Sequence, residues 1–124
     1  MLTSTYKELK FWQSAKDVSL GVVKLSRLLP QERVAWIIID QLLRASFSVG
    51  ANISEGFGKF KGKEYTRFLM ISLGSANETE YWLELLKDIY PRFTDSINLI
   101  LVRNKETIKM LTSSIKTLKS RQVK

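Results

Sequence analysis

The chain has 124 residues, enough for a single domain whose apolar core needs no covalent crosslinks. It contains no cysteine and no histidine, which excludes disulfides, thiolate chemistry, Ser-His-Asp triads and the usual zinc ligands. Its formal net charge of +8 favours polyanionic partners such as RNA, DNA or acidic membrane surfaces, although a basic composition also serves solubility alone. Because cysteine and histidine are absent, catalysis is the less favoured interpretation.

The chain shows no sign of a targeting segment or a second domain. Its polar N-terminus lacks the apolar region of a secretory signal, and the longest apolar run, Val34 to Ile39, is far shorter than a membrane span. Internal repeats, linkers and low-complexity segments are not apparent. We therefore expect a cytoplasmic protein with no membrane partner and one domain over residues 1–124.

Two prolines and a glycine-rich stretch divide the chain into four segments with apolar residues at helical spacing. The segments cover approximately residues 9–29, 31–55, 63–90 and 95–121, and Thr94 or Asp95 is a candidate N-cap for the last of them. No segment alternates apolar and polar residues as a half-buried strand does. The pattern predicts an all-α protein, folded as an up-down-up-down four-helix bundle.

The second segment, residues 31–55, has two apolar faces. One face, which includes Ile38, Leu42 and Val49, is the expected core face. The second face lies more than about 100° round the helix from the centre of the first, and it consists of Trp36, Ile39, Leu43 and Phe47. Because one bundle core cannot cover both faces, we predict that the second face is an oligomer interface between identical subunits. The alternative is that neighbouring helices wrap widely around this one.

A polar stripe runs between the two apolar faces of the same segment. It consists of Gln41, Arg44, Ser48, Asn52 and Glu55. We predict that these residues form a structural hydrogen-bond network that fixes helix register, with Glu78 or Glu80 of the third segment as the partner of Arg44. The alternatives are a merely solvated stripe, or a carboxylate active site built from Glu55, Glu78 and Glu80.

The connection between the second and third segments is rich in glycine and lysine. Gly58 and Gly62 have three residues between them rather than four, and Glu64 follows Lys63 where a hydroxyl residue is needed, which excludes the phosphate-loop motif G-x-x-x-x-G-K-[ST]. We interpret the glycines as a helix C-cap and turn, and we expect no cofactor and no metal. The cations here are Lys59, Lys61, Lys63 and Arg67, interleaved with Phe57 and Phe60. Cations of this kind neutralise phosphates, and exposed aromatic rings stack on unpaired bases. The alternative is that both rings pack against the end of the bundle.

The fourth segment carries a second basic surface along one edge of its apolar seam. Its cations are Lys105, Lys109 and Lys116, continued by Lys119 and Arg121. From Arg103 onward, seven basic residues stand against a single acid, Glu106. A solvated helix face normally mixes both signs, so this bias favours a polyanion-binding surface. The alternative is a fraying tail whose lysines keep the protein soluble.

Several motifs give the chain a resemblance to a known family. They are Leu9-Lys10-Phe11-Trp12-Gln13-Ser14-Ala15, Gln41-Leu42-Leu43-Arg44-Ala45, Asn52-Ile53-Ser54-Glu55-Gly56 and Gly74-Ser75-Ala76-Asn77-Glu78. With them the chain resembles the bacterial four-helix-bundle family of 23S ribosomal RNA intervening-sequence proteins, closely over about residues 6–90. The family's signature positions fall here on Gln41, Arg44, Ser48, Asn52, Glu55, Gly56, Gly74, Ser75 and Glu78.

The resemblance implies a small helical protein that forms a ring-shaped homo-oligomer, typically a pentamer. A related branch comprises accessory proteins of diversity-generating retroelements, which bind nucleic acid and a reverse transcriptase. No catalytic residue is implied. We therefore predict a non-enzymatic homo-oligomer that binds RNA or DNA through its basic surfaces. The alternative is a protein-interaction adaptor, such as an accessory subunit of a reverse transcriptase.

Overall fold

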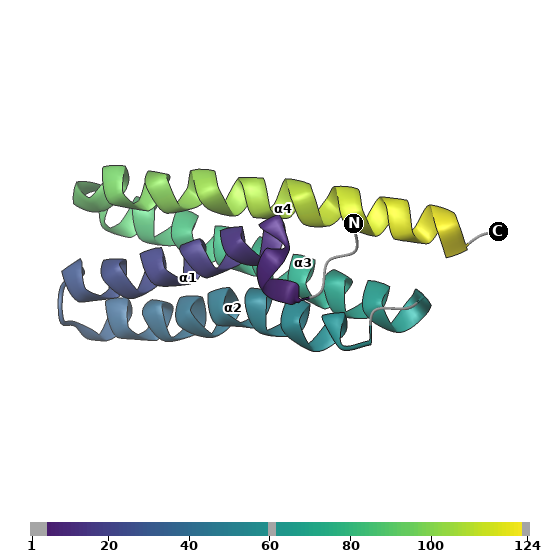
Figure 1. The fold of residues 1–124 in the computed structure, drawn as a ribbon. Helices are drawn as coiled ribbons and strands as arrows, with labels where there is room; N and C mark the ends of the chain where they lie inside the picture. The colour runs from purple at the N-terminus through teal and green to yellow at the C-terminus, as the bar shows by residue number, and fades with distance from the viewer. Residues whose placement is uncertain (1–4, 60–61, 123–124) are drawn as a thin grey trace.

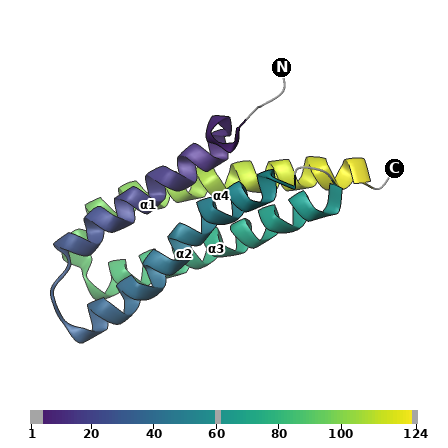
Figure 2. The ribbon, with the colours of Figure 1, turned by 60° about the horizontal axis from the view of Figure 1, so that its bottom comes forward.

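The computed structural model describes residues 5–59 and 62–122. Within them the chain forms four long helices and two short 3₁₀ turns (Figure 1). The elements are η1 Tyr6–Glu8, α1 Lys10–Leu28, α2 Arg33–Phe57, α3 Gly62–Ile89, η2 Pro91–Phe93 and α4 Thr94–Gln122. Consecutive helices run in opposite directions, and α4 also packs on α1, which closes the bundle (Figures 1 and 2). The prediction of an all-α, up-down-up-down four-helix bundle is confirmed.

The two prolines lie just beyond helix ends, because proline has no N–H to continue the helical hydrogen bonding. One residue, Leu29, separates Pro30 from the end of α1, and Pro91 begins the turn between α3 and α4. The expected cap of α4 by Thr94 or Asp95 is wrong, because both residues lie inside the helix, which begins at Thr94. The Thr94 hydroxyl donates to the Pro91 carbonyl at 2.6 Å, and the 3₁₀ turn leads directly into the helix.

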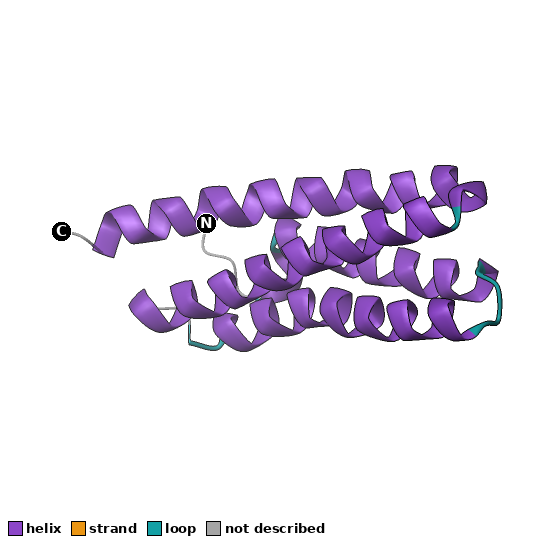
Figure 3. Ribbon diagram, turned by 180° about the vertical axis from the view of Figure 1, so that it is seen from behind, coloured by secondary structure: helices purple, strands orange, loops and turns teal. Residues whose placement is uncertain are grey.

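The turn between α2 and α3 differs in detail from the prediction. The helix α2 continues through Gly56 to Phe57, and Gly58 is its C-cap with ordinary right-handed backbone angles. The residue that needs glycine is Gly62, where φ is +62°, a conformation that side chains with a Cβ rarely adopt. Figure 3 shows this turn at the same end of the bundle as the C-terminus.

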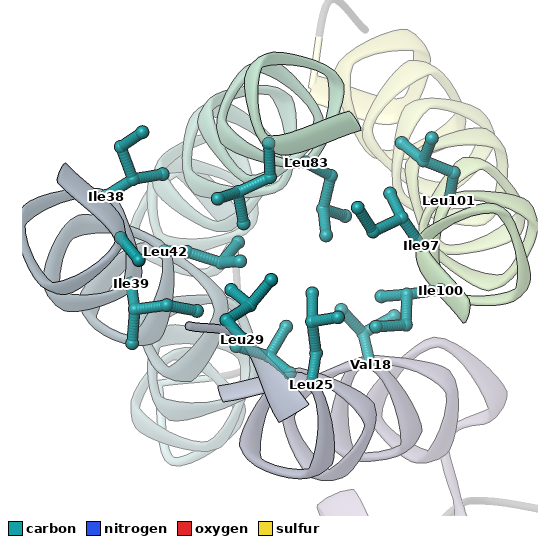
Figure 4. Close-up of a cluster of buried hydrophobic side chains, with 13 residues drawn as sticks. Val18, Leu25, Leu29, Ile38, Ile39, Leu42, Leu83, Ile97, Ile100 and Leu101 are labelled. Carbon is teal, nitrogen blue, oxygen red and sulfur yellow. The ribbon is translucent and has the colours of Figure 1, made fainter. Parts of the chain in front are cut away.

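The core consists of two apolar clusters, one toward each end of the bundle. The cluster near the α1–α2 turn contains Val18, Leu25, Leu42, Leu83 and Ile97, which converge from all four helices (Figure 4). The other cluster, near the α2–α3 turn, includes Phe11, Ile53, Leu69, Leu111 and Ile115. Burying apolar side chains in this way is the main stabilising contribution to the fold.

Small polar side chains make at least one hydrogen bond across each of the four helix–helix contacts. The bonds are Ser19 Oγ to the Ser46 carbonyl (3.1 Å), Ser72 Oγ to the Val49 carbonyl (2.9 Å), Asn104 Nδ2 to the Ala76 carbonyl (2.9 Å), and Ser14 Oγ with Thr107 Oγ1 (2.6 Å). Sliding any helix along its neighbour would break these bonds inside the bundle. They therefore fix the register of the helices.

Two properties of individual helices bear on function. By length and composition alone α2 could cross a membrane, a criterion that the core helix of a soluble protein also meets. The helix α1 has 19 residues whereas α4 has 29, so the C-terminal part of α4 continues beyond the start of α1 (Figure 1). That part of α4 and the start of α3 are therefore covered less completely than the rest of the bundle.

Candidate nucleic-acid interface

Several cations of α4 have no partner among the described residues. Lys105, Lys109 and Lys116 are exposed, and in the described part of the chain none of them has a hydrogen bond or ion pair. At 1.5 Å rise per residue, Lys109 lies about 6 Å and Lys116 about 16 Å along the helix from Lys105. Lys119 and Arg121, both exposed and unpaired, continue the charge toward the C-terminus. Lys105, Lys109, Lys116 and Lys119 thus lie along one side of a straight helix, whereas Arg121 lies about 160° round the helix from Lys105 and faces another side.

Two of the four cations predicted near the α2–α3 turn, Lys59 and Arg67, are engaged with neighbouring residues. Lys59 Nζ is 3.2 Å from Glu55 Oε1, and Arg67 Nη2 is 3.1 Å from Glu64 Oε2. Both cations also lie over the ring of Phe68, at 5.0 and 4.8 Å from its centroid, a contact that sequence reasoning missed. Because a carboxylate offsets the charge of Lys59 and of Arg67, these two cations attract phosphates less than the unpaired lysines of α4 do.

The remaining residues predicted at this turn are less informative. Lys63 is exposed and has no partner among the described residues. Lys61 and Phe60 lie outside the described residues. Phe57 is half-buried at the end of α2. Among the described residues, the aromatic surface for stacking on unpaired bases is therefore small here.

Part of the polar stripe forms the expected network between α2 and α3. Arg44 pairs with Glu78, and its Nη2 donates to Gln41 Oε1 at 3.0 Å. Trp82 Nε1 donates to the same Glu78 oxygen at 2.9 Å, a contact that its position four residues after Glu78 could have suggested. The Arg44 and Glu78 side chains remain 57% and 36% exposed, so the pair contributes about 1 kcal/mol or less.

A second group of hydrogen bonds lies one turn further along the same contact. Ser48 Oγ and Ser75 Oγ are 3.0 Å apart, and Asn52 Nδ2 donates to Ser48 Oγ at 2.9 Å. Glu55 does not join this group, which corrects the prediction. It reaches Lys59 one turn on instead, because residues four apart lie on the same face of a helix.

The structure does not bring the three candidate catalytic carboxylates together. Glu80 lies two residues after Glu78, about 200° round α3, so it faces away from Arg44 and Glu78. Glu55 lies more than two turns of α2 away from Arg44, the residue that pairs with Glu78, and it pairs with Lys59 instead. No group of three or more Asp or Glu side chains that could hold a metal ion is found among residues 5–59 and 62–122. The arrangement gives no geometric basis for the carboxylate-enzyme alternative.

Gly56, one of the signature positions, is packed too closely for any side chain. It is buried, and a Cβ at this position would lie 2.5 Å from Phe68 Cβ. We expect Gly56→Ala to lower the free energy of unfolding by about 1–3 kcal/mol, because a Cβ of a neighbouring helix cannot move aside. Urea denaturation followed by circular dichroism would measure this.

Gly74 provides the matched control for Gly56. It lies in the middle of α3, where a Cβ would meet nothing within 4 Å. Gly74→Ala should therefore raise the free energy of unfolding by about 0.5–1 kcal/mol through the better helix propensity of alanine. Equal effects of the two substitutions would show that packing against Phe68 is unimportant.

The second apolar face of α2 is only partly exposed. Trp36 and Phe47 are 53% and 48% exposed, whereas Leu43 is half-buried against the core. Ile39 is only 9% exposed and packs in the core beside Leu29, so its assignment to an oligomer interface is wrong (Figure 4). The physical reason is that the C-terminal end of α1 covers this side of α2, where Leu25 and Leu29 belong to the same apolar cluster as Ile39.

The chain is similar to known proteins in both sequence and structure. Residues 7–113 match the family described as 23S rRNA-intervening sequence protein. The chain is also similar to the crystal structure of a protein of unknown function from the S23 ribosomal protein family of Bacteroides thetaiotaomicron VPI-5482. That similarity has 32% sequence identity and a TM-score of 0.78, and it covers 86% of this chain and 98% of the other. No curated protein matches the chain. Neither description names an enzymatic activity.

Proposed function

Because the chain belongs to the family of 23S rRNA-intervening sequence proteins, we propose that it is a non-enzymatic homo-oligomer that binds RNA or DNA. The row of α4 lysines from Lys105 to Lys119, which have no partner among the described residues, is the observation that carries this proposal. A phosphate backbone gains most from cations that no carboxylate already neutralises.

The same geometry indicates how the protein would select its ligand. Lysine ammonium groups on a straight helix contact phosphates, and such contacts carry no sequence information. Few exposed aromatic rings accompany the row, so base stacking contributes little. The protein would therefore recognise a polyanionic backbone with weak sequence preference and strong dependence on salt.

The exposed aromatic residues of α2 support self-association. Trp36 and Phe47 leave a large part of their rings in water, and exposed apolar patches of this kind commonly mark interfaces. Identical subunits are the commonest partners, and the family resemblance favours five of them. The same patch also suits the alternative function, an adaptor that binds a different protein such as a reverse transcriptase.

Fluorescence anisotropy with a labelled structured RNA and a labelled duplex DNA tests the proposal, on protein whose mass is checked by light scattering. We expect the logarithm of the binding constant to fall linearly with the logarithm of salt concentration, with a slope of about −3 or steeper if three or more lysines contact phosphates. Absence of binding near physiological salt by a confirmed oligomer would reject the proposal and favour the adaptor.

A further inference from the structure

A pocket lies at the basic end of the bundle, where α4 extends beyond the start of α1. Its volume is about 270 Å³, and Phe11, Tyr65, Ser114, Thr117 and Arg121 are among its lining residues. The pocket exists because no further turn of α1 covers this stretch of α3 and α4. It is therefore a consequence of unequal helix lengths.

The lining combines an apolar wall with several polar groups. Phe11 belongs to the core cluster and Tyr65 packs against it, so both present ring surface to the pocket. The hydroxyls of Tyr65 and Ser114 have no hydrogen-bond partner among the described residues, and Arg121 has no carboxylate there. Burial raises the pKa of Tyr65, which keeps its hydroxyl protonated and able to donate. Rings, hydroxyl donors and a free guanidinium thus meet at one site.

Two other depressions of similar size lack this combination. One, between α1 and α4, is lined mainly by apolar residues such as Leu28 and Leu99. The other contains Arg103, but this guanidinium already lies 3.7 Å from Glu106 and 4.0 Å from Asp17. Neither offers an unpaired cation beside aromatic rings.

We propose that the pocket holds the terminal nucleotide of a nucleic-acid strand, with the base against Phe11 and Tyr65 and a terminal phosphate at Arg121. This inference rests on the proposed function, because the lysine row of α4 would hold the rest of the strand. A volume near 270 Å³ is at the lower limit of small-molecule sites, so it suits one nucleotide rather than several. Guanidinium groups bind phosphates bidentately, and a terminal phosphate carries more charge than one within the chain.

The experiment compares one RNA in three forms, linear with terminal phosphates, linear without them, and circular. We expect the phosphorylated linear form to bind about tenfold more tightly than the circular one, because circular RNA offers only the α4 contacts. Arg121→Gln should remove this preference and leave the affinity for circular RNA within about twofold. Arg27→Gln, an exposed arginine near the opposite end of the bundle, is the matched control and should keep the preference.

The outcomes separate this inference from the proposed function. If circular and phosphorylated linear RNA bind equally, end recognition is overturned while nucleic-acid binding stands. If neither form binds, both are overturned. Ser114→Phe, which fills the pocket, should also abolish the preference. Adenosine monophosphate at millimolar concentration should compete with the linear form and not with the circular one, and failure to compete would contradict the assignment of the pocket.

Discussion

Replacing Lys105, Lys109 and Lys116 of α4 by glutamate is expected to weaken RNA binding roughly 100-fold at physiological salt. Each substitution removes a cation that contacts phosphate and adds a charge that repels it. The salt slope should become shallower by about 3, since each lost phosphate contact contributes about 0.9. All three side chains are exposed and unpaired in the described structure, so the free energy of unfolding should change by less than about 1.5 kcal/mol in total.

A matched control separates a binding surface from a general effect of net charge. Lys24, Arg27 and Arg33 are exposed cations near the α1–α2 turn, and replacing them by glutamate changes the net charge by the same amount. This control should lower affinity only modestly, through weaker long-range attraction. Equal losses in both triple variants would mean that net charge alone governs binding. Unchanged affinity in the α4 variant would exclude α4 as the surface.

The fold could be predicted from the sequence because its determinants are local. The spacing of apolar residues specifies helices, and proline and glycine specify where they end. The details of the turns were less accessible. Gly56 and Gly58 look equivalent in sequence, yet Gly56 lies inside α2 against Phe68, and only the packing of α3 distinguishes them.

The candidate site was only partly predictable, since it depends on contacts between helices. The pairing of Arg44 with Glu78 follows from chemistry, because a cation and a carboxylate lie on the facing edges of adjacent helices. The burial of Ile39 depends on how the C-terminal end of α1 packs against α2, and sequence periodicity does not contain that information. The pocket at Arg121 could not be predicted from the sequence either. It results from the different lengths of α1 and α4.

Replacing Trp36 and Phe47 together by glutamine is expected to convert the proposed homo-oligomer into monomers that remain helical. Both rings are about half exposed in the single chain, so their removal takes away little of the core. In an oligomer the same rings would be buried at the centre of a contact, where aromatic residues contribute most of the binding energy. Light scattering would report the mass, and circular dichroism the helix content.

Leu99 and Val102 of α4 provide the control that makes this result specific. They are 76% and 60% exposed, so they are also apolar side chains in water, but they lie on a different helix from Trp36 and Phe47. Changing both to glutamine should leave the mass unchanged if the α2 residues form the interface. Dissociation of the α4 variant alone would move the interface to α4, next to the proposed nucleic-acid surface. Unfolding of the α2 variant would instead show that Trp36 and Phe47 stabilise the subunit, because a pure interface residue leaves the isolated bundle intact.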